Sequence, residues 1–456
     1  MEQHFAGAPA NRGARYTRRV QLGMTSGTLG AAASLAAACG VGGDAATTQT
    51  QTAGCASRIE YFCRLRADQG VNPFILPAFA AATPKCTLEV VTMPSTELQA
   101  KLLASVVGGT PPAVVDLPPG WTKQLQAQRL LAPVDDLFKR DKLNKDDFSR
   151  GLWEQMSFAG KIWFMPGQQT NADFVLFWNK AHFREAGLDP EKGPTTITEL
   201  ESMLPKLTRE TRGEFERVGM VPWDLYGHGN TFQAWGRAFG AEFIDERKDE
   251  ITFTHPRVLK AVEFYTGWAR RLDAAKVINF RTSVTPQNVH WFGSGRFSVQ
   301  PLVASALAGV RQHDAAMQIG AGPMPGDTPG KPGTVSVGGW AVGAVPSPKR
   351  EEAWEFMRFF GASPEGTAAV ARIGDIPGWL KSPSLVELSK DPLFKAFVDG
   401  LRRAEFAQLG FYLPGGWNAN PIQDIIDGKR GAREVLAEIN TDANVRHAEW
   451  KSRNKQ

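Results

Sequence analysis

Short apolar strands alternate with amphipathic helices along the chain, and this alternation constrains the fold more than any other feature. Residues 59–63, 86–93 and 113–117 have the apolar and β-branched composition of buried strands. Between the second and third strands, Leu98 and Leu102 recur at helical spacing, and two glycines follow where the helix is expected to stop. Strand–helix–strand units of this length build mostly parallel sheets covered by helices. The sequence therefore predicts an α/β fold.

A second α/β region is expected farther along the chain. It begins with a strand over residues 174–179, and helices follow over residues 180–186, 198–207, 256–272 and 351–360. The chain has 456 residues, which is long enough for two or more domains with cores of their own.

Residues 1–38 are interpreted as a bacterial export signal. The charged part holds four arginines, which are Arg12, Arg15, Arg18 and Arg19. An uncharged stretch rich in Gly and Ala follows and ends at Cys39 in a segment that resembles a lipoprotein box. Lipidation of Cys39 is therefore predicted, with residues 39–57 as a flexible tether; an uncleaved membrane anchor and cleaved soluble export are the alternatives. The arginine pair resembles a twin-arginine signal, and the general secretory route remains open.

The remaining cysteines suggest one possible disulfide and no metal site. Outside the cytoplasm thiols tend to pair. Cys63 ends one predicted strand and Cys86 begins another, so a Cys63–Cys86 bridge is feasible if these strands are neighbours. The 7 histidines are scattered, and no paired Cys or His spacing typical of zinc sites occurs. Neither a metal nor another cofactor is predicted.

Charge and motif content argue against nucleic-acid binding and against catalysis. The net charge is +5, but residues 1–38 carry four arginines and Glu2, so about +2 remains for the rest of the chain. No phosphate-binding glycine loop and no GxSxG motif is present. The acidic pairs at residues 135–136 and 146–147 lie among lysines and arginines, which is typical of helix caps or solvated faces. We therefore expect a binding protein rather than an enzyme.

Tryptophan is unusually frequent, with 13 Trp against 5 Tyr. Six of the indoles lie beside Gly or Pro in predicted loops: Trp121, Trp223, Trp235, Trp340, Trp379 and Trp417. A flat indole can stack on the C–H face of a sugar ring, while nearby polar groups satisfy the hydroxyls. Each of these tryptophans taken singly could equally anchor a loop, but together they favour a cleft that stacks sugars.

Several motifs occur in the order typical of one protein family. They are GTPP at residues 109–112, APVDDL at 132–137, FWNK at 177–180, FREAGL at 183–188, PTT at 194–196, FGSGR at 292–296, GGW at 338–340 and PEG at 364–366. This series, between about residues 58 and 440, resembles the extracellular solute-binding proteins of carbohydrate ABC transporters, the maltose-binding-like family.

The resemblance implies a two-lobed periplasmic-binding-protein fold of type II, in which each lobe is a mostly parallel sheet flanked by helices. Lobe 1 would contain residues 58–168 plus 338–390, and lobe 2 would contain residues 169–337 plus 391–456. Crossovers are expected near residues 166–170, 336–339 and 389–394, where the lobes would close on ligand by hinge bending.

The resemblance also implies ligand-binding positions. Family positions that contact sugar correspond to Trp121, Asn171, Asp173, Trp235, Gly339, Trp340 and Trp379. Where relatives often carry Trp-His early in the first strand, this chain has Phe62, Cys63 and Arg64. Arg64 is therefore predicted as a forked donor to hydroxyls or to a carboxylate or phosphate, with a surface arginine as the alternative.

The predicted function is the substrate-binding component of an ABC importer that captures a mono- or oligosaccharide. The resemblance implies a monomer, lipid-anchored at the outer face of the cytoplasmic membrane, that passes sugar to permease subunits driven by a cytoplasmic ATPase. The alternatives on the same fold are a glycerophosphate-type or other small polar solute, favoured if Arg64 and other basic groups line the cleft, and a polyamine or metal ligand. A secreted carbohydrate-active enzyme, which needs two carboxylates across the cleft, is the rival from another class.

Overall fold

The computed structural model describes residues 58–64, 70–167, 174–287, 289–331, 333, 336–337, 341–403, 405–406, 409, 413 and 416–453. The predicted export signal, Cys39 and the tether lie outside the described residues.

In the part of the chain that the structure describes, the first sheet has five strands in the order β2-β1-β3-β15-β6. Their bounds are β1 Arg58–Arg64, β2 Thr87–Met93, β3 Val114–Leu117, β6 Met165–Pro166 and β15 Ala341–Ala344. β1 pairs in parallel with β2 and β3, as strand–helix–strand connections predict. β15 is antiparallel to both β3 and β6, so the sheet is mixed. A strand from residues 341–344 thus lies between strands that end at residues 117 and 166.

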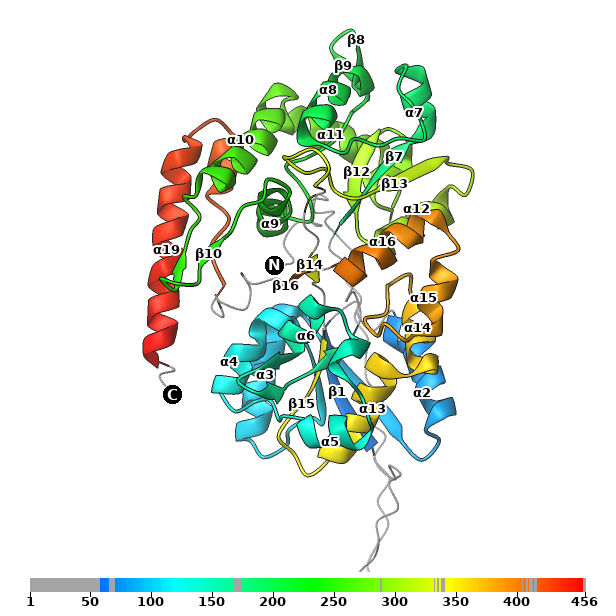
Figure 1. Ribbon diagram of the computed structural model, residues 1–456, viewed down its shortest axis with the longest axis vertical. Helices are drawn as coiled ribbons and strands as arrows, with labels where there is room; N and C mark the ends of the chain where they lie inside the picture. Colours follow the sequence, from blue (N-terminus) through cyan, green and yellow to red (C-terminus); the bar gives the residue numbers. More distant parts are fainter. Residues whose placement is uncertain are drawn as a thin grey trace, which may run out of the picture. The chain divides into compact units, whose positions relative to one another are not determined.

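Helices cover both faces of this sheet. Their bounds are η1 Val71–Ile75, α2 Leu76–Ala82, α3 Ser95–Val107, η2 Pro119–Trp121, α4 Thr122–Ala127, α5 Asp135–Arg140, η3 Lys145–Asp147, α6 Arg150–Met156, α13 Arg350–Ala362, α14 Pro364–Arg372 and α15 Pro383–Leu388. Figure 1 shows α3 and α4 on one side of the sheet and α2, α13 and α14 on the other. Aromatic contacts hold α13 in place, because the ring of Phe356 lies 5.2 Å from that of Tyr61 and 5.3 Å from that of Phe79.

Among the described residues, the second sheet has three strands in the order β12-β7-β13, with β7 Val175–Asn179 in the centre. β12 Val299–Leu302 and β13 Ile319–Gly322 both pair antiparallel to it. The expectation of a mostly parallel second sheet is therefore wrong. A parallel sheet needs each strand to return through a helical crossover to a neighbour, whereas here the chain makes a long excursion between Asn179 and Val299 before it pairs with β7 again.

The helices of this region are α7 Lys180–Glu185, α8 Ile197–Leu207, α9 His228–Ala238, α10 Pro256–Arg271, α11 Ala274–Val284, η4 Trp291–Ser294, α12 Ala304–His313, α16 Pro392–Arg403, α18 Ile422–Ile426 and α19 Ala432–Arg453. Several start at side-chain caps, of which those of α7 and α8 are examples. The Asn179 side chain accepts from the amides of Ala181 and His182, and Thr196 forms a capping box with Glu199.

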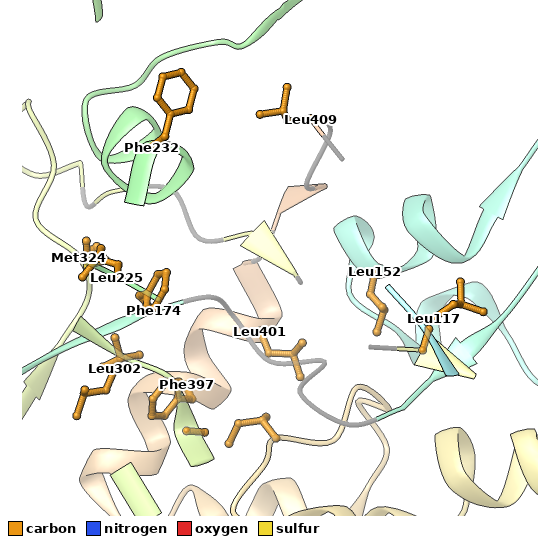
Figure 2. Packing of buried hydrophobic residues seen from close by; sticks show 14 of the residues in the cluster. Leu117, Leu152, Phe174, Leu225, Phe232, Leu302, Met324, Phe397, Leu401 and Leu409 are labelled. Carbon is orange, nitrogen blue, oxygen red and sulfur yellow. The ribbon is translucent and has the colours of Figure 1, made fainter. Parts of the chain in front are cut away.

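Short strand pairs connect the larger elements. They are β4 Ser157–Phe158 with β5 Lys161–Ile162, β8 Arg209–Thr211 with β9 Glu214–Arg217, β10 Ile244–Asp245 with β11 Glu250–Ile251, and β14 Ser336–Val337 with β16 Glu405–Phe406. Helix α16 packs on the second sheet, where the ring of Phe397 lies 5.6 Å from that of Phe177. Figure 2 shows Phe397 of α16 and Leu302 of β12 among the buried side chains of the core.

The predicted Cys63–Cys86 bridge is wrong. The parallel register pairs Arg58 with Thr87 and Cys63 with Thr92. Cys86 precedes Thr87, so it lies about 20 Å along the strands from Cys63, far beyond the separation of about 7 Å that a disulfide spans. Cys63 keeps a buried thiol, whose Sγ lies 3.6 Å from the carbonyl oxygen of Arg64, and Cys86 takes part in a disulfide that does not include Cys63. The two strands are neighbours, but the two cysteines are not.

Trp235 lies in a helix and in the core, not in a loop. It belongs to α9 and its side chain is 0% exposed. The indole Nε1 donates to the carbonyl oxygen of Pro222 at 2.7 Å, and the ring meets that of Phe264 edge-on at 4.7 Å. The neighbouring Gly236 does not break the helix; a Cβ there would come within 2.3 Å of the Phe243 ring, so close packing requires a glycine.

We expect Trp235→Phe to lower the free energy of unfolding by about 1–3 kcal/mol, because it removes a buried hydrogen bond and leaves a small cavity. Urea unfolding followed by circular dichroism measures the change. Trp153→Phe is the control, because Trp153 is only half-buried on α6. An equal loss in the two variants would contradict this account of Trp235.

Candidate functional site

Four chain segments meet at one edge of the first sheet. β1 ends there at Arg64 and β3 ends there at Leu117, because these strands are parallel. β6 is antiparallel to β15, which is antiparallel to β3, so β6 also ends at this edge, at Pro166. β15 begins at the same edge with Ala341, which is opposite both Leu117 and Pro166. We call this the carboxyl edge, and it is the place where sheets of this kind bind ligands.

A buried ion pair occupies the carboxyl edge. Arg64 Nη1 lies 2.7 Å from Asp116 Oδ2, and the Arg64 backbone amide donates to the same oxygen at 3.4 Å. The side chains are 9% and 2% exposed. Burial raises the pKa of Asp116, although the adjacent guanidinium opposes that rise. Arg64 is thus neither a surface arginine nor an isolated cation.

Trp121 lies directly after β3. The residues following the strand form η2, in which the Trp121 amide donates to the carbonyl oxygen of Pro118 at 2.9 Å. The Trp121 side chain is half-buried and packs against the core. Helix α4 starts at the next residue, so the indole is fixed between the strand and the helix. A half-buried indole at this position can present its remaining face to a ligand.

Trp379 lies near the end of β6. It forms an isolated antiparallel bridge with Phe148. The preceding Gly378 lies so close to Pro166 that an added Cβ would approach it within 2.8 Å. The Trp379 side chain is half-buried, and in the part of the chain that the structure describes its buried Nε1 has no hydrogen-bond acceptor. Trp379 thus brings a second half-buried indole to the carboxyl edge.

Helix α4 connects this edge to the C-terminal helix. The Lys123 ammonium lies 5.9 Å from the centre of the Trp450 ring on α19. Burial lowers the pKa of Lys123, and the nearby Asp249 opposes this. Asp249 is itself held by α19, at 2.9 Å from His447 Nε2 and 2.7 Å from Lys451 Nζ. The helix that follows Trp121 is therefore in contact with α19.

The structure places some of the predicted site residues and not others. Arg64, Trp121 and Trp379 lie at or beside the carboxyl edge, and Trp235 lies in the core. Of the other loop tryptophans, Trp223 is buried and Trp417 packs between Phe232 and Phe253 at 4.7 and 4.9 Å. The remaining predicted positions lie outside the described residues: Asn171, Asp173, Gly339, Trp340 and the lipidation site Cys39.

Asp116 is a site residue that the sequence analysis missed. A charged side chain in the apolar strand at residues 113–117 must find a partner when it is buried. The need of a buried Asp116 for a charged partner could have identified it from the sequence. Arg64, at the end of the neighbouring strand, was the candidate partner.

A polar hollow that is open to solvent lies beside the second sheet, after the carboxyl end of β7. It is lined by His182, Glu185, Arg209, Glu216, Arg217, Gly295 and Arg296. Arg217 pairs with Glu185 at 2.6 Å and Arg209 pairs with Glu216 at 2.9 Å. No predicted ligand residue lines it, and its paired charges give it a structural role.

The described ranges contain no cluster of three or more His, Cys, Asp or Glu side chains suited to a metal ion. Within the same ranges, every helix is too short or too polar to cross a membrane.

Comparison with protein families gives one match over most of the chain. The model of bacterial extracellular solute-binding proteins matches residues 75–396. The sn-glycerol-3-phosphate-binding periplasmic protein UgpB of Pectobacterium atrosepticum is 25% identical over 280 residues, which are 58% of this chain and 60% of the relative. The chain thus matches about 60% of the length of such curated relatives.

Solved structures share the fold. CpMnBP1 with mannotriose bound has a TM-score of 0.72 at 21% identity, covering 85% of this chain and 99% of that one. UgpB from Mycobacterium tuberculosis in complex with glycerophosphocholine has a TM-score of 0.70 at 21% identity, covering 86% and 99%. The predicted α/β periplasmic-binding-protein fold is therefore confirmed.

We expect the stability of the fold to depend on pH because a buried histidine, His182, lines the polar hollow. His182 is 9% exposed, and its Nδ1 lies 3.1 Å from Ser298 Oγ. Burial, and then the nearby Arg217, lower the pKa of His182 to about 4. Between its unfolded value of about 6.5 and that lower value, only the unfolded chain takes up the proton, so stability present above about pH 6.5 is lost as pH falls.

We expect His182→Asn to lose less stability than the unchanged chain when pH falls from about 7 to about 4.5. Urea midpoints measured across this range test the prediction. His255→Asn is the control, because His255 is exposed. Parallel pH profiles for His182→Asn and the unchanged chain would contradict it.

Proposed function

The chain belongs to the bacterial extracellular solute-binding protein family, a family of binding proteins rather than enzymes, and on this premise we propose that it captures a sugar for an ABC importer. In this proposal a mono- or oligosaccharide binds at the carboxyl edge of the first sheet and is delivered to permease subunits in the membrane. Binding energy is spent on closing two lobes around the solute, so the closed state must bind it better than the open one.

The half-buried Trp121 at the carboxyl edge is the observation that carries the proposal. A flat, rigid indole directly after β3 suits the C–H face of a pyranose ring. The half-buried Trp379 beside the end of β6 offers a second indole surface, which supports the proposal. Asn171, Asp173, Gly339 and Trp340 complete the proposed site, the polar members as partners for hydroxyls and Trp340 as a further stacking surface. CpMnBP1, which shares the fold, was solved with mannotriose bound.

The proposed architecture has two lobes and an anchor. Residues 58–168 with 338–390 form the first lobe, and residues 169–337 with 391–456 form the second. The packing of α16 on the second sheet supports a crossover between α15 and α16. Residues 1–38 act as the export signal and Cys39 carries the lipid, which holds the protein at the outer face of the cytoplasmic membrane.

A glycerophosphate-type solute is the second candidate. It is favoured by the relative from Pectobacterium atrosepticum, a protein named for sn-glycerol-3-phosphate binding, and by the Mycobacterium tuberculosis structure with glycerophosphocholine. A ligand screen by thermal shift and tryptophan fluorescence separates the two. It should contain neutral sugars such as mannobiose and maltose, together with sn-glycerol 3-phosphate and glycerophosphocholine. Stabilisation by the phosphate compounds alone would contradict the sugar proposal.

We expect Trp121→Ala to weaken binding of the stabilising sugar by about 1–3 kcal/mol, or about 5- to 150-fold, because the ring loses its stacking surface. Isothermal titration calorimetry measures the change. Trp153→Ala is the matched control, since its half-buried indole packs 5.7 Å from the ring of Phe138 on α5. Unchanged affinity in Trp121→Ala would remove Trp121 from the site.

We expect Cys39→Ser to move the protein expressed in a bacterial host from the detergent phase to the aqueous phase of a Triton X-114 partition, because the acylated residue is lost. Cys55→Ser is the control, because no uncharged apolar run leads into Cys55 as one does into Cys39, and it should partition like the unchanged chain. If Cys39→Ser also stays in the detergent phase, Cys39 is not the anchor.

A further inference from the structure

We propose that the Arg64–Asp116 ion pair makes the carboxyl edge selective for uncharged, hydroxyl-bearing solutes and against phosphate esters. This inference rests on the proposed function, because it names the class of solute that the same site accepts. It concerns a pair of residues rather than Arg64 alone, which the sequence analysis considered without its partner.

Pairing of strands in the first sheet places Arg64 next to Asp116. Parallel pairing of β1 with β3 sets Phe62 opposite Val115, so the two strands end side by side and bring Arg64 to Asp116. The 2.7 Å contact and the additional backbone hydrogen bond hold the carboxylate against the guanidinium. At 9% and 2% exposure, neither charge is screened well by solvent.

This arrangement disfavours an anionic ligand. The guanidinium charge is already compensated by a carboxylate that shares its site. A phosphate group near Arg64 would have to displace Asp116, which would leave a buried carboxylate without its partner, or lie beside it as a second negative charge. Either outcome penalises the anion, which is how a site rejects one ligand class without better contacts to another.

The same arrangement can accept a hydroxyl. Asp116 Oδ2 takes both hydrogen bonds from Arg64, and among the described residues Oδ1 receives none. A sugar hydroxyl can donate to a carboxylate oxygen and keep the ion pair intact. A fully ionised phosphate has no proton to donate, so it cannot replace the hydroxyl in this role.

The other cation close to Trp121 does not reverse the balance. The Lys123 ammonium lies over the ring of Trp450 and is attracted by Asp249, which places its charge on the side of α4 that faces α19. Among the residues that the structure describes at the carboxyl edge, the charges closest to Trp121 on the sheet are therefore those of the Arg64–Asp116 pair, which sum to zero.

The test compares neutral sugars with phosphate esters on the full chain. The probes are mannose with mannose 6-phosphate, glucose with glucose 6-phosphate, and maltose and mannobiose with sn-glycerol 3-phosphate, each measured by isothermal titration calorimetry. We expect the unchanged chain to bind a neutral sugar at least about tenfold more tightly than any phosphate compound. Equal or tighter binding of an ester overturns the inference, and this comparison needs no variant.

Asp116→Asn then tests the pair itself. It removes the negative charge at nearly constant shape, so we expect the ratio of sugar to phosphate affinity to fall by about tenfold or more. Asp136→Asn is the matched control, because Asp136 is the exposed partner of Arg350, on helix α5. Circular dichroism confirms that both variants are folded.

The outcomes separate the two proposals. If sugars bind but the ratio is the same in Asp116→Asn and in the unchanged chain, the selectivity inference is wrong and sugar capture stands. If phosphate esters bind and sugars do not, both fail. If no probe binds the unchanged chain, sugar capture fails and the selectivity inference fails with it.

Discussion

The hydrogen-bond ladder of the first sheet is the constraint on which the candidate site depends. Parallel strands point the same way, so β1, β3 and β6 all end at one edge, although their last residues are Arg64, Leu117 and Pro166. β6 ends at the same edge only because β15, which begins at Ala341, pairs with β3 on one side and with β6 on the other. The candidate site is thus assembled from four segments spread over most of the chain.

Arg64 and Asp116 are buried, whereas the other charged residues of β1 and β2, which are Arg58, Glu60 and Glu89, are not. An ion pair in a dry environment is weak support for stability, because desolvation offsets much of the attraction. Its location beside Trp121 is more easily explained by recognition of a polar solute. Lys123, two residues after Trp121, contacts the ring of Trp450 on α19. The segment that carries Trp121 therefore lies beside an element far along the chain.

Much of the fold could be predicted from local patterns, and the errors have identifiable causes. The predicted strands at residues 59–63 and 174–179 agree with β1 and β7 to within one residue at each end. Trp235 was assigned to a loop because Gly236 follows it, yet that glycine lies within α9, where the Phe243 ring leaves no room for a side chain. The mostly parallel second sheet was an expectation from the family resemblance, and the local sequence pattern could not correct it because that pattern does not say which strands pair with β7.

The amino-acid sequence by itself determined which segments become strands and helices, since apolar periodicity and capping residues act over a few neighbouring positions. It also carried the ordered motifs that pointed to the family. The tertiary structure alone decided which residues meet. Register keeps Cys63 about six residues along the strand from Cys86, and strand order brings Arg64 to Asp116. Both depend on pairing between distant segments, which no local pattern specifies.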